Sequence, residues 1–387
     1  MKSPESTPLS AVEKNKSLDM GYGELSPEEQ ERMKIVNEQF KNPQFVEIPI
    51  PGNENEKIRV EYVILDAREN KSENNLEEID NTMVYIPGFS ASYRAPEKFI
   101  KLMAVRENKR VINISLPSTG ESDPMPTEIR KWKKPDRSFE FYADILNNSL
   151  DAIRESEKDD DKPTTDEISL VSASMGSVIA TEMAIKYPNK VKDLVLVHPA
   201  GVNEESILQL AKRFVAEKFR DKKTLLQNPE IDSAHKKELE DAYQEMFGRS
   251  LQEAYEEAGE DGTFDLQDAD TQYHDFNKAA ASDVLKDGTP NIIKNPLWRA
   301  WEAFTIANGD VLKMLPKVRA NTYIIYGGGD KLFPPEQIKK IVDNMPNTQN
   351  IRIDTFPSMG HDSIYQEARK YSSSIGTFLD KMRKKGD

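Results

Sequence analysis

The feature that most constrains the fold is the regular alternation of short apolar segments with amphipathic helical patterns along most of the chain. This alternation is typical of β-α-β units, in which helices connect parallel strands and cover the sheet. The sequence predicts strands at 45–51, 57–67, 82–89, 110–117, 167–174, 192–201, 321–330 and 350–361. Helices are predicted at 95–106, 138–156, 175–187, 335–345 and 362–384. We therefore expect an α/β fold with a mostly parallel, eight-stranded sheet that begins with an antiparallel pair of strands.

One long interval, 202–312, contains no strand pattern and is helical and rich in charged residues. It is predicted to form a helical cap, inserted after the sixth strand, over the edge of the sheet where strand carboxyl ends gather. The α/β core then comprises 45–201 and 313–387. Residues 1–44 form an N-terminal extension that we expect to be partly disordered and then helical. Its helix is predicted to begin at SPEE, which has the Ser-x-x-Glu pattern of a capping box.

The composition narrows the classes of partner and chemistry. The formal net charge of -14, from 67 acidic and 53 basic residues, disfavours nucleic acid and anionic membranes as partners, since both require a concentrated positive surface. The absence of cysteine excludes disulfides, thiolate metal sites and a cysteine nucleophile. No apolar run is long enough for a signal peptide or a membrane-spanning helix, so a cytoplasmic protein without membrane insertion is expected. No feature of the sequence indicates an oligomeric state.

A serine, Ser174, stands where the uncharged segment ISLVSASMGSVIA changes from a strand pattern to a helix pattern. One interpretation is a helix N-cap, a position that favours serine. The other is a nucleophile on a tight strand-to-helix turn, which requires small residues two positions before and after the serine. Ser172 and Gly176 occupy these positions, so the pattern is Ser-x-Ser-x-Gly in place of Gly-x-Ser-x-Gly.

A serine nucleophile needs a histidine that accepts its proton and a carboxylate that orients the histidine. Of the four histidines, His361 is favoured because it follows the last predicted strand in a glycine-containing loop. His235 is expected to be exposed on a charged helix. His274 could face the substrate, but a surface or packing role is favoured. His198 ends the sixth predicted strand and could lie close to the site, but a hydrogen bond to a backbone carbonyl is favoured there.

The carboxylate is predicted to be Asp330, which follows the seventh strand behind three glycines. An aspartate at this position could instead be an Asx-turn residue. The catalytic interpretation is favoured because Ser174, Asp330 and His361 each follow a predicted strand. Carboxyl ends of parallel strands meet at one edge of a sheet, so the three side chains are expected to meet there.

Acyl transfer also needs backbone N–H groups that stabilise the negative carbonyl oxygen, each contributing about 3 kcal/mol. The predicted donors are the N–H groups of Phe89 and Met175. Phe89 follows the Pro87–Gly88 turn after the third strand, and Met175 follows Ser174. Taken alone, such a Pro-Gly turn is more often an ordinary β-turn.

The motifs PGF, LPSTGESD, SASMG, GGGD and GHD, in this order, resemble those of the α/β-hydrolase superfamily, in its esterase/lipase-like serine-hydrolase branch with a helical cap. The resemblance covers 45–201 and 313–387. It implies the triad order serine, aspartate, histidine. Two motifs depart from the family pattern. The third-strand motif is Pro-Gly in place of His-Gly, and LPSTGES stands in place of Asp-x-Pro-Gly-x-Gly-x-Ser.

The resemblance and the triad together predict a carboxylesterase-like enzyme that cleaves a small-molecule ester, thioester or lactone through an acyl-enzyme, with no metal or cofactor. A carbon–carbon bond hydrolase, a cofactor-free perhydrolase and a non-catalytic ligand-binding protein remain as alternatives. A dehalogenase or epoxide hydrolase is excluded, because it would carry aspartate in place of Ser174. The predicted pocket-lining residues are Gly88, Trp298, Trp301 and Phe304. The three aromatics could equally pack the cap onto the core.

Overall fold

The computed structural model describes residues 25–68, 82–126, 136–157, 167–201, 296–308, 313–328, 330, 332–333, 335–345, 351–356, 359–361 and 363–386. Apart from the helix at 296–308, the predicted cap lies outside the described residues, as do His235 and His274. No helix within these ranges is long and apolar enough to cross a membrane.

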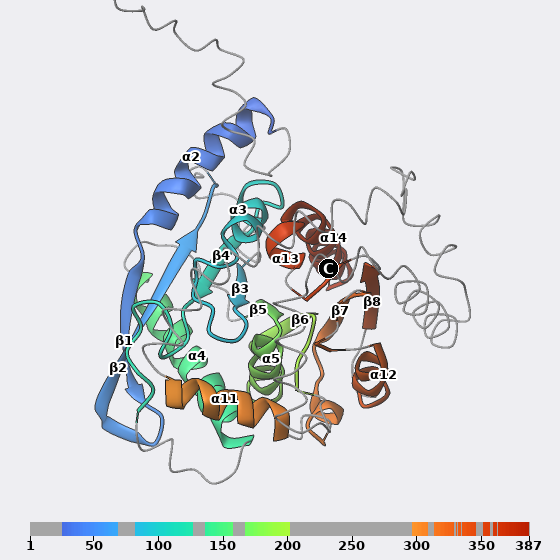
Figure 1. Cartoon of the computed structure of the whole chain (residues 1–387). Helices are drawn as coiled ribbons and strands as arrows, with labels where there is room; N and C mark the ends of the chain where they lie inside the picture. The colour runs from blue at the N-terminus through green and yellow to red at the C-terminus, as the bar shows by residue number, and fades with distance from the viewer. Residues whose placement is uncertain are drawn as a thin grey trace, which may run out of the picture.

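Eight described strands form one sheet, as predicted (Figure 1). They are β1 (Gln44–Ile50), β2 (Asn53–Leu65), β3 (Thr82–Ile86), β4 (Arg110–Ile114), β5 (Ile168–Ala173), β6 (Val191–Val197), β7 (Asn321–Gly327) and β8 (Ile351–Phe356). Their order across the sheet is β1-β2-β4-β3-β5-β6-β7-β8. Strand β2 pairs antiparallel with both β1 and β4, and all other neighbours are parallel. The predicted antiparallel pair and mostly parallel sheet are therefore confirmed.

Burial on both faces explains why the central strands are apolar throughout. In β3, Met83 and Tyr85 join one buried cluster, and Val84 and Ile86 join the other. Successive side chains of a strand point to opposite faces, so every position in such a strand meets a hydrophobic layer. Continuous apolar runs of this kind are typical of parallel sheets covered by helices on both sides.

The helices form two layers around the sheet (Figure 1). Buried side chains from α2 (Pro27–Lys41), α3 (Glu97–Val105), α13 (Ser363–Gln366) and α14 (Ala368–Gly386) pack against one face. Those from α4 (Asp136–Glu157), α5 (Met175–Lys186), α11 (Pro296–Asn308) and α12 (Pro335–Asp343) pack against the other. The fold is thus an α/β sandwich of three layers, with the sheet in the middle.

Helix α2 begins at the predicted capping box. The Glu29 N–H donates to Ser26 Oγ at 3.2 Å, and the Ser26 N–H donates to the Glu29 carboxylate at 2.7 Å. Met33, Val36 and Phe40 form the buried side of the helix. These contacts join the N-terminal helix to the same hydrophobic cluster as α3 and α14.

The last helix differs from its prediction as a single helix over 362–384, because it breaks at Glu367 into α13 and α14. In a continuous helix, Ser363 and Tyr371 would lie about 12 Å apart along the axis. The break brings Ser363 Oγ to 2.7 Å from the Tyr371 hydroxyl. The sixth strand also ends earlier than predicted, at Val197, so that His198 leaves the sheet.

Candidate active site

Ser174 lies in the tight turn between β5 and α5. Its backbone has φ 52° and ψ -123°, a conformation that residues other than glycine rarely adopt. Although Ser174 occupies the N-cap position of α5, its side chain makes no capping hydrogen bond. Its Oγ lies 2.9 Å from Nε2 of His361. The strained turn therefore directs the hydroxyl to a histidine, and the simple N-cap interpretation does not describe this serine.

Close packing explains the small residues on either side of this turn. A Cβ at Gly176 would lie 2.5 Å from the carbonyl oxygens of both Ile86 and Pro87, closer than atoms can approach. The Ser172 hydroxyl is buried and donates to the carbonyl of Val195 on the neighbouring strand at 3.0 Å. A serine fits in place of the family's glycine because this carbonyl satisfies its buried hydroxyl.

His361 and Asp330 continue the hydrogen-bonded chain that begins at Ser174. Nδ1 of His361 lies 2.9 Å from Oδ2 of Asp330. The other carboxylate oxygen accepts the backbone N–H groups of Leu332 and Phe333, at 2.9 and 3.0 Å. The structure thus brings together the three side chains predicted from separate strand ends, after β5, β7 and β8.

The surroundings of Asp330 keep its carboxylate ionised. Burial alone would raise its pKa, but the attraction of His361 and hydrogen bonds from His198 and His361 hold the pKa well below its ordinary value. The ionised carboxylate accepts a hydrogen bond from the N–H at Nδ1 of His361. Nε2 of that ring then carries no proton and faces Ser174 as an acceptor. This arrangement suits a histidine that removes a proton from a hydroxyl.

The predicted oxyanion turn lies against the serine. A Cβ placed on Gly88 would lie 3.3 Å from the Cβ of Ser174. Gly88 also accepts a turn hydrogen bond from the N–H of Ala91, at 3.2 Å, so the segment is a β-turn as well. Within the described part of the chain, the N–H groups of Phe89 and Met175 donate to no protein acceptor. Both amides are therefore available, and their role as oxyanion donors stays a prediction.

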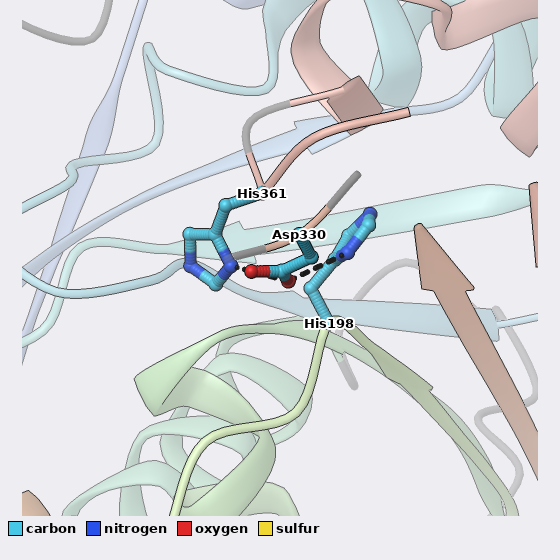
Figure 2. A group of neighbouring side chains, drawn as sticks. All are labelled: His198, Asp330 and His361. Atoms are coloured by element: carbon cyan, nitrogen blue, oxygen red, sulfur yellow. Dashed lines mark hydrogen bonds and ion pairs between the residues drawn. The ribbon is translucent and has the colours of Figure 1, made fainter. Parts of the chain in front are cut away.

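His198 is a member of this cluster whose importance the sequence analysis missed. Its Nδ1 lies 3.1 Å from Oδ2 of Asp330, the oxygen that His361 also contacts. Figure 2 shows the two imidazole rings on opposite sides of the carboxylate. Nε2 of His198 lies 2.7 Å from the Tyr371 hydroxyl and 3.1 Å from Ser363 Oγ. The expected strand-end histidine therefore has side-chain partners that local sequence did not reveal.

Gly327 makes room for the His198 ring. A Cβ at this position would lie 2.6 Å from Cε1 of His198 and 2.2 Å from the carbonyl oxygen of Met359. Gly327, the first of the three glycines before Asp330, is therefore required by two neighbours. One is the ring of His198, just after β6, and the other is the loop that precedes His361. This requirement was the signal in the sequence that could have pointed to a crowded site.

The two histidines and Asp330 also have the residue types of a metal site. Their ligand atoms lie within 4.8 Å of one another. However, Oδ2 of Asp330 contacts both rings at hydrogen-bond distance, 3.1 and 2.9 Å, and the opposite nitrogen of His361 faces Ser174. These contacts use the atoms that a metal would need, so we interpret the group as a proton-transfer site.

Helix α11 carries the aromatic candidates for the predicted pocket. Trp298 is buried, and its indole N–H lies within hydrogen-bond distance of the Tyr142 hydroxyl and Glu302 Oε1, at 3.0 and 3.1 Å. Its ring stacks on that of Trp301, with centroids 4.6 Å apart. These contacts support the packing interpretation for Trp298, and the lining role of both rings stays a prediction. The side chain of Phe304 lies outside the described residues.

A buried ion pair on α11 was not foreseen from the sequence. Arg299 and Glu302 contact each other, and Arg299 also donates to the carbonyl of Ser118 at 2.6 Å. Burial raises the pKa of Glu302, and the attraction of Arg299 opposes that rise. The bond from Arg299 to Ser118 connects α11 to the loop after β4. The guanidinium also lies 5.9 Å from the ring centre of Phe89, so the pair is next to the predicted oxyanion turn.

Comparison with known proteins places the chain in a family. The family model described as alpha/beta hydrolase fold matches residues 81–367. The chain therefore belongs to the alpha/beta hydrolase fold family. Its fold and its relatives support its classification as a hydrolase.

Two curated relatives are hydrolases of oxo acids. The chain is 22% identical over 298 residues to the 2-hydroxy-6-oxononadienedioate/2-hydroxy-6-oxononatrienedioate hydrolase of Comamonas testosteroni, covering 76% of this chain and 82% of that protein. It is 24% identical over 214 residues to the 2-hydroxy-6-oxo-6-phenylhexa-2,4-dienoate hydrolase of Burkholderia cepacia, covering 55% of this chain and 63% of that protein.

Solved structures share the fold at low sequence identity. A thermophilic esterase from Thermogutta terrifontis has a TM-score of 0.53 and 16% identity, covering 88% of this chain and 99% of that chain. A proline iminopeptidase from Mycobacterium smegmatis has a TM-score of 0.54 and 14% identity, covering 89% of this chain and 100% of that chain. Hydrolases of different bonds thus share this architecture.

Proposed function

We propose that the protein is a serine hydrolase that cleaves a carboxylic ester, a thioester or a lactone through an acyl-enzyme on Ser174. The observation that carries the proposal is the continuous hydrogen-bonded chain from Ser174 through His361 to Asp330, with 2.9 Å at each step. This series of hydrogen bonds links a nucleophile, a base and an orienting carboxylate in the arrangement that activates a serine hydroxyl.

In the first half of the proposed reaction, Ser174 Oγ attacks the carbonyl carbon while its proton moves to Nε2 of His361. The carbonyl π electrons move to the oxygen, which becomes an oxyanion opposite the N–H groups of Phe89 and Met175. The oxyanion then reforms the carbonyl, and the bond to the leaving alcohol, thiol or ring oxygen breaks. His361 returns the proton to the leaving group, while Asp330 stabilises the charged imidazole throughout.

In the second half, water replaces the leaving group. His361 removes a proton from the water as it attacks the acyl carbon, and a second oxyanion forms at the same backbone donors. Its collapse breaks the bond to Ser174, and the proton on His361 passes to the serine oxygen. The products are a carboxylic acid and the free enzyme.

A second candidate is hydrolysis of a carbon–carbon bond next to a ketone. It is favoured by the names of both curated relatives, whose substrates are 2-hydroxy-6-oxo acids with a ketone and no ester. Hydrolysis of such a compound at the ketone breaks the bond between the carbonyl carbon and its neighbour. The same nucleophile and base serve this reaction, but the leaving carbon must accept the proton that an alcohol accepts in an ester.

Replacing the serine tests the proposal. Ser174→Ala is expected to lower hydrolysis of p-nitrophenyl acetate and butyrate by about 10⁴-fold or more, because the nucleophile is lost. A fluorescent fluorophosphonate should label the wild-type protein but not this variant. Ser177→Ala, which removes a neighbouring buried hydroxyl, is the matched control and should keep labelling. Full ester hydrolysis by folded Ser174→Ala would contradict the proposed mechanism, and absence of labelling in the folded wild type would favour a ligand-binding protein.

A substrate panel separates the two candidate reactions. Purified enzyme is incubated with p-nitrophenyl esters, an acyl thioester, a lactone and 2-hydroxy-6-oxo-6-phenylhexa-2,4-dienoate, and products are identified by mass spectrometry. Serine-dependent turnover of the esters with an unchanged dienoate supports the ester assignment. Release of benzoate from the dienoate at a higher kcat/KM than any ester would replace it with carbon–carbon hydrolysis. Halide oxidation that requires added peroxide would identify a perhydrolase.

A further inference from the structure

His198 occupies a buried position at the centre of the proton-transfer site. Its side chain is 1% exposed, and its backbone φ of 48° is in the left-handed region that favours glycine. A strained, buried histidine beside a catalytic carboxylate needs a physical reason, because strain of this kind costs of order 1–3 kcal/mol. The triad reaction assigned above uses only one imidazole, so it leaves His198 unexplained.

The partners of His198 place an oxygen that can accept a hydrogen bond at each ring nitrogen. On one side, Nδ1 faces the Asp330 carboxylate at 3.1 Å. The pKa of that carboxyl is held well below its ordinary value, so the carboxylate can only accept, and this contact is a hydrogen bond when Nδ1 carries a proton. The Gly327 N–H also points to Nδ1, at 3.3 Å, and donates to it only when that nitrogen carries no proton; this contact is the longer of the two and involves no charge. The charge-assisted bond to Asp330 is therefore the stronger of the two.

On the other side, Nε2 of His198 faces two hydroxyl oxygens, that of Tyr371 at 2.7 Å and that of Ser363 at 3.1 Å. Ser363 Oγ lies 2.7 Å from the carbonyl oxygen of Gly360, which can only accept, so the serine proton goes there. Burial raises the pKa of Tyr371, which therefore keeps its proton. With the serine proton on the Gly360 carbonyl, the tyrosine proton makes the 2.7 Å contact between the Tyr371 hydroxyl and Ser363 Oγ. Nε2 of His198, 2.7 Å from the Tyr371 oxygen, is left as the donor of the last bond. In this arrangement of protons, both ring nitrogens of His198 are donors.

We propose that His198 is a positioning residue held as a buried imidazolium. It shares the Asp330 carboxylate with His361. Its positive charge keeps His361 unprotonated, and so active as a base, to a lower pH. The inference rests on the proposed serine-hydrolase function, because it concerns the base of that reaction. The positive charge of His198 balances the negative charge of Asp330, so the buried pair is neutral overall. Each member of the pair also has hydrogen-bonding partners.

The effect on His361 follows from charge and distance. The two imidazole rings have centroids 5.7 Å apart. A fixed positive charge at this distance opposes a second positive charge on His361. Among the described residues, the titratable groups in contact with His198 include Asp330 and Tyr326 from β7 and its loop, His361 after β8, and Tyr371 on α14. Glu367, between α13 and α14, adds a charge that acts on Tyr371.

The same network fixes the loop that carries His361. From His198 it runs through Tyr371 and Ser363 to the carbonyl of Gly360, the residue before His361. The break between α13 and α14 allows these hydroxyls to meet. His198 thus orients His361 twice, once through the shared carboxylate and once through the backbone next to it.

The kinetic test compares pH profiles of kcat/KM for p-nitrophenyl acetate. His198→Asn is the sharpest variant, because asparagine tolerates a positive φ and can still donate to Asp330 but carries no charge. We expect the acid limb of its profile to move up by about one pH unit, so that activity near pH 5 falls by about tenfold. Tyr326→Phe is the matched control, since it removes a 3.2 Å bond to the Asp330 backbone and no positive charge. Its acid limb should stay in place even if its rate falls.

An unchanged acid limb in His198→Asn, with the rate lowered or not, would overturn the electrostatic role. The same holds if Tyr326→Phe shifts the limb equally. These outcomes differ from failure of the proposed function, which would be seen first as absence of Ser174-dependent hydrolysis in the wild type. A substitution that prevents folding is recognised by circular dichroism, and the following measurement then decides without any variant at His198.

The second test observes the protonation state directly and needs no activity. Histidine is labelled with ¹⁵N in the Ser174→Ala protein, and long-range ¹H–¹⁵N correlation spectra are recorded from about pH 5 to about pH 8. The chain has four histidines, so four rings appear. We expect one buried ring with both nitrogens protonated at about pH 8, well above the ordinary histidine pKa of about 6.5. If all four rings are neutral there, the buried imidazolium does not exist and the proposal is wrong.

Discussion

Strands β5 and β6 are neighbours in the sheet, and each is followed directly by a residue with a left-handed backbone, Ser174 at φ 52° and His198 at φ 48°. Both side chains then lead to the same carboxylate. Ser174 reaches Asp330 through His361, and His198 contacts it directly. The two strand ends therefore present a polar side chain from a strained turn toward one buried charge.

The two turns differ in what holds them. The turn at Ser174 is recognisable close by in sequence, because Gly176, two residues on, lets the start of α5 approach the carbonyls of Ile86 and Pro87. The turn at His198 is held by groups far away in the chain, Tyr371 and Ser363 on one side and Gly327 on the other. A similar local strain can thus arise from a short motif or from tertiary contacts alone. Only the first kind leaves a recognisable sequence pattern.

The largest expected effect comes from removing the Asp330 carboxylate, which both strand ends share. Asp330→Asn should lower kcat for ester hydrolysis by about 10⁴-fold, because the carboxylate no longer orients and stabilises the His361 imidazolium. It should also slow fluorophosphonate labelling of Ser174. A variant with wild-type kcat would show that neither strand end acts through this carboxylate.

The same variant gives a stability prediction with a definite sign. Burial alone would raise the pKa of Asp330, but the histidines depress it, so ionised Asp330 stabilises the fold above its unfolded-state pKa of 3.8. That stabilisation is lost as the pH falls below 3.8 toward the folded-state pKa. The free energy of unfolding should therefore differ most between wild type and Asp330→Asn at neutral pH, with the gap narrowing in acid. Urea titrations at about pH 7 and about pH 3.5 measure both values.

Next in size is a pair of matched glycine substitutions, one at each turn. Gly176→Ala places a Cβ 2.5 Å from two carbonyl oxygens, and Gly327→Ala places one 2.2 Å from a carbonyl and 2.6 Å from the His198 ring. Each should lower the free energy of unfolding by about 1–3 kcal/mol, because backbone must shift to relieve the overlap. Gly176→Ala should mainly slow labelling of Ser174, whereas Gly327→Ala should also move the acid limb of the pH profile.

A third glycine serves as the control for both. Gly52 has φ 80° and open space around its Cα, so Gly52→Ala carries a backbone cost of about 1 kcal/mol without a steric clash. It should leave labelling and the pH profile unchanged. If Gly176→Ala and Gly327→Ala gave identical readouts, the distinction between a locally held turn and a distantly held turn would be lost.

The smallest expected effect concerns the hydroxyl that joins β5 to β6. Ser172→Ala removes its 3.0 Å bond to the Val195 carbonyl and should cost about 1 kcal/mol of unfolding free energy, measured in urea. Ser172→Gly restores the family's usual residue and should cost slightly more, since glycine adds unfolded-state entropy. Both variants should hydrolyse esters at close to the wild-type rate. A large loss of activity would place Ser172 in the catalytic machinery.

Much of the fold could be predicted because it depends on local patterns. Apolar segments of β3 and β5 have the composition of strands buried on both faces, and the capping box at Ser26 marks a helix start that the structure confirms. The single helix predicted at the C-terminus was wrong, because the break at Glu367 depends on Ser363 and Tyr371 meeting across it. No local propensity encodes that contact.

The sequence by itself determined the α/β class and the strand order along the chain, and it predicted Ser174, Asp330 and His361 as a set of side chains that the structure brings together. It could do so because small residues, strand ends and turn glycines are required within a few positions of one another. Only the tertiary structure decided what surrounds Asp330, because His198 comes from a neighbouring strand and is 132 residues away in sequence. Its two ring nitrogens acquire their partners from β7, α13 and α14 together, and a histidine at a strand end has no such meaning until those segments are packed around it.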